Sequence, residues 1–79
     1  MIDNYNLDIF KENVRFLRIK SKLTQRTLAD NLGCSNAMIC DIEKGRSIPK
    51  MDFVINFCNF FGVDMNDLFL KNLIEVMHI

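Results

Sequence analysis

Residues 24–45 read TQRTLADNLGCSNAMICDIEKG and indicate two short helices joined by a turn at Gly33. Apolar residues stand at helical spacing on both sides of this turn, so that one seam can bury both helices: Leu28, Leu32, Cys34, Ile39 and Ile42. Gly33 can adopt the positive φ that a sharp turn between helices requires. Thr24 and Ser35 stand where the two helices should begin, and their hydroxyls can accept hydrogen bonds from free N–H groups of the first turns.

The length and composition of the chain indicate one small globular domain. It has 79 residues, of which 49% are hydrophobic and 25% are charged, and disordered chains contain fewer hydrophobic residues. We expect a single domain over residues 1–79 with its core at about 8–70. A core of this size is only marginally stable by itself, so dimerisation would help the fold.

The charges are unevenly distributed, although the formal net charge is zero. Residues 1–50 contain nine Lys and Arg against six Asp and Glu, whereas residues 51–79 contain one against four. One end of the domain could therefore approach a polyanion while the other end faces away. The overall balance lacks the strongly basic character that is usual in nucleic-acid-binding domains, so charge alone does not indicate DNA.

The three cysteines, Cys34, Cys40 and Cys58, indicate neither a disulfide framework nor a metal site. Their number is odd and no CxxC pair occurs. We expect Cys34 and Cys58 to pack in the core as reduced thiols and Cys40 to be more exposed. The sequence shows no secretory leader and no apolar run of about 18 residues or more, which favours a cytoplasmic protein that does not enter a membrane.

No catalytic constellation is visible in the sequence. It contains no Gly-rich phosphate loop, no paired carboxylates and no nucleophile motif. His78, the only histidine, lies next to the C-terminus, where a base lacks the fixed partner and the water-excluding site that it needs. The sequence therefore predicts a protein that is not an enzyme and that requires no cofactor.

A helix is expected on the N-terminal side of the central pair, over residues 8–21. Phe10, Val14 and Leu17 recur there at helical spacing. A basic stripe runs beside them and includes Lys11, Arg15, Arg18 and Lys22. The stripe is either a solvated face or, in part, a track for a phosphate backbone.

Two further helices are expected on the C-terminal side, over residues 51–61 and from Met65 onward. A second apolar line on the first of them exceeds what one small core needs and suggests a surface for a partner: Phe53, Phe57 and Phe60. Residues 69–79 are rich in apolar side chains where a monomer usually ends in polar residues, and we interpret them as a dimerisation element. The alternative is that this segment folds onto its own domain.

Many residues of the chain match one known sequence pattern in register. The pattern lTQxxLAxxlGxSxxxIxxxExGxxxP is met by Leu23-Thr24-Gln25, Leu28-Ala29, Leu32-Gly33, Ser35, Ile39, Glu43, Gly45 and Pro49. Its flanks are met by Leu17-Arg18 and by Phe61-Gly62-Val63 with Leu68. Over about residues 10–69, the chain thus resembles the Cro/C1-type helix-turn-helix regulators, also called XRE-like regulators.

The resemblance implies an all-α fold, a compact five-helix bundle of the lambda-repressor-like type with its helix-turn-helix at about residues 24–45. The helix that follows Ser35 would enter the major groove of double-stranded DNA and read bases through Asn36, Ala37 and Asp41. Phosphates would be held by residues at the helix starts and in the following loop: Thr24, Gln25, Ser35, Lys44, Arg46 and Ser47. The resemblance also implies a structural ion pair between Arg18 and Glu43.

Two functions remain open from the sequence. The first is a sequence-specific transcriptional regulator, expected to be a dimeric repressor that reads two half-sites about 10 base pairs apart. The second is a protein-interaction module or antitoxin-type regulator, which binds a partner protein through the surplus phenylalanines and the C-terminal segment. The size of the chain suits a phage-type repressor, a restriction-modification controller or an antitoxin.

Overall fold

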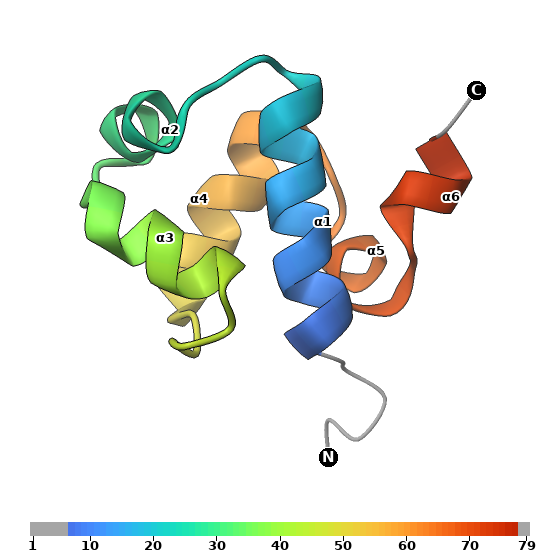
Figure 1. Ribbon diagram of the computed structural model, residues 1–79. Helices are drawn as coiled ribbons and strands as arrows, with labels where there is room; N and C mark the ends of the chain where they lie inside the picture. Colours follow the sequence, from blue (N-terminus) through green and yellow to red (C-terminus); the bar gives the residue numbers. More distant parts are fainter. Residues whose placement is uncertain (1–6, 78–79) are drawn as a thin grey trace.

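The computed structural model describes residues 7–77, which form six α-helices and no strand (Figure 1). In chain order the helices are α1 (Leu7–Lys20), α2 (Gln25–Leu32), α3 (Asn36–Glu43), α4 (Met51–Phe61), α5 (Met65–Leu70) and α6 (Leu73–Met77). The prediction of an all-α fold is confirmed. Residues 1–6 and 78–79, which include His78 and the end of the predicted dimerisation element, lie outside the described residues.

The bundle has six helices rather than the predicted five, because the C-terminal segment is interrupted. Lys71 has an extended backbone, with φ −109° and ψ 141°, and ends α5. Asn72 then starts a new helix, since its Oδ1 accepts a hydrogen bond of 3.1 Å from the N–H of Ile74. Asparagine side chains compete with the backbone for such bonds, and this favours helix starts over helix interiors.

The helix-turn-helix is formed by α2 and α3, and local hydrogen bonds fix its shape. Thr24 and Ser35 cap the two helices as the sequence predicts. Each hydroxyl accepts a hydrogen bond of 3.0 Å from the backbone N–H three residues further on. Gly33 has a φ of 71°, and the turn is closed by the N–H of Cys34, which donates to the carbonyl of Ala29 at 3.0 Å. This geometry matches the αL cap that glycine favours.

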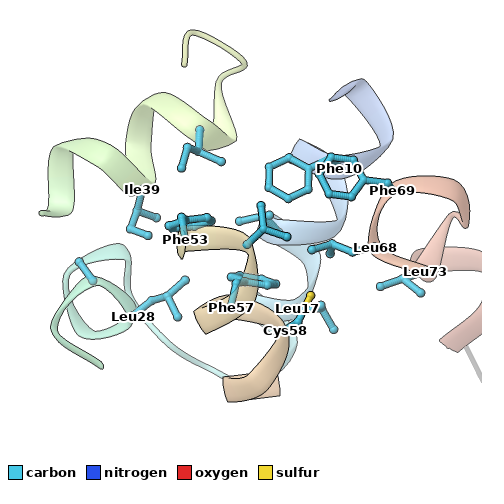
Figure 2. Close-up of a cluster of buried hydrophobic side chains, with 14 residues drawn as sticks. Phe10, Leu17, Leu28, Ile39, Phe53, Phe57, Cys58, Leu68, Phe69 and Leu73 are labelled. Carbon is cyan, nitrogen blue, oxygen red and sulfur yellow. The ribbon is translucent and has the colours of Figure 1, made fainter. Parts of the chain in front are cut away.

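The core contains buried apolar side chains from all six helices (Figure 2). Phe10 of α1 stacks on Phe69 of α5, with ring centroids 4.6 Å apart and an interplanar angle of 11°. Phe57 of α4 is fully buried near the centre of the cluster, and Leu28 and Ile39 bring the helix-turn-helix onto it. Burial of such side chains is the main source of stability in a domain of this size.

The predicted partner surface on α4 is wrong in two of its three residues. Phe53 and Phe57 are buried and only Phe60 is exposed. The reason is the position of α4, which packs against both α2 and α5. A helix covered on two sides must be apolar over more of its circumference than a helix with one covered face.

Asn13 is a buried polar side chain that fastens α1 to the C-terminal part of the domain. Its Nδ2 donates to the carbonyls of Leu68 and Lys71, at 2.7 Å each, and its Oδ1 accepts from the N–H of Leu73 at 3.0 Å. The side chain thereby satisfies three backbone groups at the connection between α5 and α6. A buried amide is tolerated in a core when all its groups are bonded in this way.

The apolar C-terminal segment is divided between the core and the surface. Phe69 and Leu73 are buried within the domain, whereas Leu70 and Ile74 are exposed. Part of the segment therefore folds onto its own domain. No helix within residues 7–77 is long and apolar enough to cross a membrane.

Candidate nucleic-acid interface

The start of α3 is an exposed helix end that carries the predicted base-reading residues. Asn36 and Ala37 are exposed, and Asp41, one turn further along, is half-buried. On the opposite side of α3, Ile39 and Ile42 are buried in the core. This anchorage turns the polar face of the helix outward, where it can reach base edges in a major groove.

Asp41 also contacts the loop that follows α3. Its Oδ1 lies 3.9 Å from Nη1 of Arg46, and its carbonyl accepts a hydrogen bond of 2.8 Å from the N–H of Arg46. An exposed ion pair of this kind contributes at most about 1 kcal/mol. The carboxylate can therefore exchange the guanidinium for a base donor such as the amino group of cytosine.

The structure brings Arg18 and Glu43 together in an ion pair with two hydrogen bonds. Arg18 Nε donates to Glu43 Oε2 at 2.7 Å, and Arg18 Nη2 donates to Oε1 at 3.0 Å. The remaining Nη1 donates to the carbonyl of Leu23 at 2.8 Å. Only 3% of the Glu43 side chain and 12% of the Arg18 side chain are exposed. The pair thus joins the end of α3 to α1 and to the turn before α2 from within the domain.

Gln25 joins the same network, in a place where the sequence predicted a phosphate contact. Its Nε2 donates to Glu43 Oε1 at 3.1 Å, which uses one of its two amide N–H groups and leaves the other for a ligand. The backbone N–H groups of Gln25 and Arg26 have no hydrogen bond within residues 7–77. Together with the helix dipole, these N–H groups make the start of α2 suitable for an anion.

The loop after α3 holds the other predicted phosphate ligands, and all of them are exposed: Lys44, Arg46 and Ser47. Gly45 shapes this loop with a φ of +76°. A Cβ at Gly45 would lie 3.2 Å from Cδ and 3.3 Å from Nζ of Lys11 on α1. The ammonium of Lys11 therefore lies against the loop that carries these predicted phosphate ligands.

A cavity of about 300 Å³ lies between the start of α3 and the start of α4. Cys34 and Met38 line it from the helix-turn-helix, and Phe53 lines it from α4. Burial raises the pKa of the Cys34 thiol, which keeps the thiol protonated at neutral pH and weakens it as a nucleophile or metal ligand. Burial, and after it the carboxylate of Asp64, raises the pKa of Cys58 in the same direction. Within the described part of the chain, no group of three His, Cys, Asp or Glu side chains could hold a metal ion.

The fold and this surface define a class of protein: a DNA-binding domain of the helix-turn-helix type. A family model described as "Helix-turn-helix" matches residues 14–68. The chain belongs to the Cro/C1-type, XRE-like family of helix-turn-helix transcriptional regulators. This is a family of regulators that bind double-stranded DNA and not a family of enzymes, in agreement with the prediction from the sequence.

Similar proteins support this assignment. An uncharacterized HTH-type transcriptional regulator of Methanocaldococcus jannaschii is 37% identical over 60 residues, which cover 76% of this chain and 91% of that protein. The solution structure of the SOS-response repressor LexA from Eubacterium rectale is 32% identical, with a TM-score of 0.75 over 80% of this chain and 67% of that one. The P22 c2 repressor, solved with a synthetic operator, is 25% identical, with a TM-score of 0.72 over 80% and 94%. These structures confirm the lambda-repressor-like fold.

Proposed function

We propose that this protein is a dimeric repressor that reads a two-half-site operator by placing α3 in the major groove. The observation that supports the proposal most strongly is the start of α3, where Asn36 and Ala37 are exposed while the other side of the helix is held in the core. The major groove of B-DNA is wide enough to admit an α-helix presented in this way.

Three side chains of α3 are the proposed base readers. The amide of Asn36 can bond adenine through two hydrogen bonds, the methyl group of Ala37 can touch a thymine methyl, and the carboxylate of Asp41 can accept from cytosine. Asn36 and Ala37 are the first two residues of α3, and Asp41 follows one turn later. In the proposed docking, this order would put the three side chains over neighbouring base pairs of one half-site.

Phosphates would be bound at the two helix starts and in the loop after α3. Thr24, Gln25 and Ser35 stand at the helix starts, where backbone N–H groups favour an anion. Lys44, Arg46 and Ser47 follow α3 and are exposed. Contacts of this kind set the register of the protein on the duplex and do not depend on base sequence.

Dimerisation is proposed because one domain with balanced charges has few phosphate contacts of its own. Two domains that bind two half-sites of one duplex add their contacts and gain specificity. Occupancy would then depend on the concentration of the protein, since dimerisation and DNA binding are linked by mass action. The repressor role is supported by the similar structures, among which LexA and P22 c2 are repressors. Leu70 and Ile74 are exposed and would contribute to a dimer contact through residues 69–79.

The test is retention of DNA from the region that flanks the protein's own gene. In a mobility-shift assay at moderate salt, Asn36→Ala should weaken binding by about tenfold to a hundredfold, because a bidentate base contact is worth roughly 1–3 kcal/mol. Asn59→Ala, which removes an exposed asparagine from α4, is the matched control and should bind like the natural protein. Equal binding by both variants, or no protected site in a footprint, would overturn the proposal.

The second candidate function, binding of a different protein, retains one specific observation. Phe60 of α4 is exposed and packs edge-on against Phe61, with ring centroids 4.9 Å apart. If a partner protein were the main target, Phe60→Ser would abolish the function in the cell and Asn36→Ala would leave it intact. The burial of Phe53 and Phe57 removes most of the surface on which this candidate depended.

A further inference from the structure

Three exposed apolar side chains lie just before α4 and in its first turns. Ile48 lies in the preceding loop with 76% of its surface exposed, Met51 is the first residue of α4 with 61% exposed, and Ile55 is one turn further with 45% exposed. Ile48 and Met51 have the highest exposure among the large hydrophobic residues of the described chain. We call these three residues the α4 strip. Exposed apolar side chains that gather in this way mark an interaction surface.

We propose that the α4 strip is the surface on which a second copy of this chain docks to form the dimer. The proposal rests on the proposed function and names the surface that the dimer uses. It replaces the C-terminal segment as the main contact, because Phe69 and Leu73 of that segment are already buried in their own domain.

The strip is flanked by one positive and one negative side chain, which could pair with the opposite charges of a second copy of the chain. Lys50 and Asp52 stand on either side of Met51. Lys50 forms no ion pair within residues 7–77, and the Asp52 carboxylate accepts a hydrogen bond of 2.8 Å only from the neighbouring N–H of Phe53. In an interface with two-fold symmetry, a residue that contacts a second residue is itself contacted in return. Lys50 of each copy can therefore face Asp52 of the other, around a shared apolar centre.

The position of the strip also suits an operator with half-sites one turn apart. Centres of half-sites lie about 34–36 Å apart in that case, so each α3 must lie within about 17 Å of the two-fold axis. The domain measures 32 × 29 × 21 Å along its principal axes. In Figure 1, α1 stands between α3 and α6. A contact through α6 would place most of the domain between α3 and the axis, and the two α3 helices would be too far apart.

The Ile48 end of the strip lies beside α3 instead, whereas Met51 and Ile55 do not line the cavity that Ile48 shares with α3. Ile48 and Lys50 line the same cavity as Met38 of α3, and only the residues between Glu43 and Met51 separate the two helices in the chain. A two-fold axis at the Ile48 end of the strip would therefore bring the two α3 helices near each other on one side of the dimer. This is the arrangement that two adjacent major grooves on one face of a duplex require.

The first test measures dimerisation of the full chain without DNA, by sedimentation equilibrium. Met51→Glu places a charge in the centre of the proposed contact and should raise the dimer dissociation constant at least tenfold. Glutamate is favourable in the first turn of a helix, so the fold should be retained, as checked by circular dichroism. Ile74→Ser is the matched control on α6 and should change the dissociation constant by less than threefold. If Ile74→Ser separates the dimer and Met51→Glu does not, the C-terminal segment is the contact and the proposal is wrong.

The second test exchanges the two charges. Lys50→Asp and Asp52→Lys should each weaken the dimer, because each sets like charges against one another across the axis. The double variant restores opposite charges and should recover most of the lost affinity. Additive weakening in the double variant would contradict the proposed pairing.

The outcome is separable from that of the proposed function. A natural protein that is monomeric at 100 µM would overturn this inference, yet a footprint on operator DNA that depends on Asn36 would still support the regulator. Conversely, the natural protein could form a dimer that Met51→Glu separates and yet protect no DNA in a footprint. This result would support the α4 strip as the dimer contact and contradict the proposed binding to an operator.

Discussion

The guanidinium of Arg18 holds the carboxylate of Glu43 through hydrogen bonds of 2.7 and 3.0 Å, with only 3% of the Glu43 side chain exposed. Through this pair the last residue of α3 is joined to α1, and Gln25 at the start of α2 bonds the same carboxylate. The buried Glu43 carboxylate at the end of α3 therefore bonds side chains of both α1 and α2. The relative positions of these three helices depend on it.

Loss of Arg18 should destabilise the domain more than loss of any surface cation. Arg18→Ala leaves the buried Glu43 carboxylate without its partner, and we expect the free energy of unfolding to fall by about 3 kcal/mol. Lys71→Ala, which breaks an exposed pair with Asp67 at 3.2 Å, is the control and should cost about 0.5 kcal/mol or less. Urea unfolding of both variants measures the difference. If both variants lost the same free energy of unfolding, the expected cost of leaving the Glu43 carboxylate unpaired would be contradicted.

Asn13 should prove essential for the docking of the C-terminal helices. Asn13→Leu removes the bonds to Leu68, Lys71 and Leu73, and each buried backbone group left without a partner costs about 1–3 kcal/mol. Hydrogen exchange of the Leu73 amide should accelerate strongly, while exchange in α2 changes less. Uniform acceleration in all helices would instead mean that α5 and α6 do not open separately from the rest.

Lys22 offers a stabilising change. It has a φ of 61° after the end of α1, where the N–H of Leu23 donates to the carbonyl of Arg18 at 3.0 Å. A residue with a Cβ is strained in this left-handed conformation by roughly 1–2 kcal/mol, and glycine is not. Lys22→Gly should therefore raise the free energy of unfolding by about 0.5–1 kcal/mol after the entropy of glycine is counted. A lower melting temperature for this variant would contradict the assigned conformation.

Local signals in the sequence predicted the helix-turn-helix well. Thr24, Ser35 and Gly33 each act within a few residues of chain, through a cap or a positive φ, so their roles follow from the sequence near them. The same holds for the apolar seam, because Leu28 and Leu32 in α2, like Ile39 and Ile42 in α3, stand at helical spacing. These residues shape the central pair through contacts within a short stretch of chain.

Contacts between distant segments could not be predicted in this way. Periodicity marks the apolar lines of α4, but it does not say how many neighbouring helices cover them. For this reason the sequence alone cannot distinguish the buried Phe53 and Phe57 from a partner surface. Asn13 has the same residue type as many exposed asparagines, and only its burial against Leu68 reveals its role. The bond from Gln25 to Glu43 likewise depends on how α2 and α3 pack.

The most direct measurement combines Asn36→Ala with changes of single base pairs in the operator. We expect one A·T pair in each half-site whose replacement weakens the natural protein by about tenfold or more but barely affects the Asn36→Ala variant, since both changes remove the same contact. Replacement of any other base pair of the operator should weaken the Asn36→Ala variant as much as it weakens the natural protein. If every base pair retained its full effect after Asn36→Ala, the start of α3 would not read the sequence, and the account of this surface would be wrong.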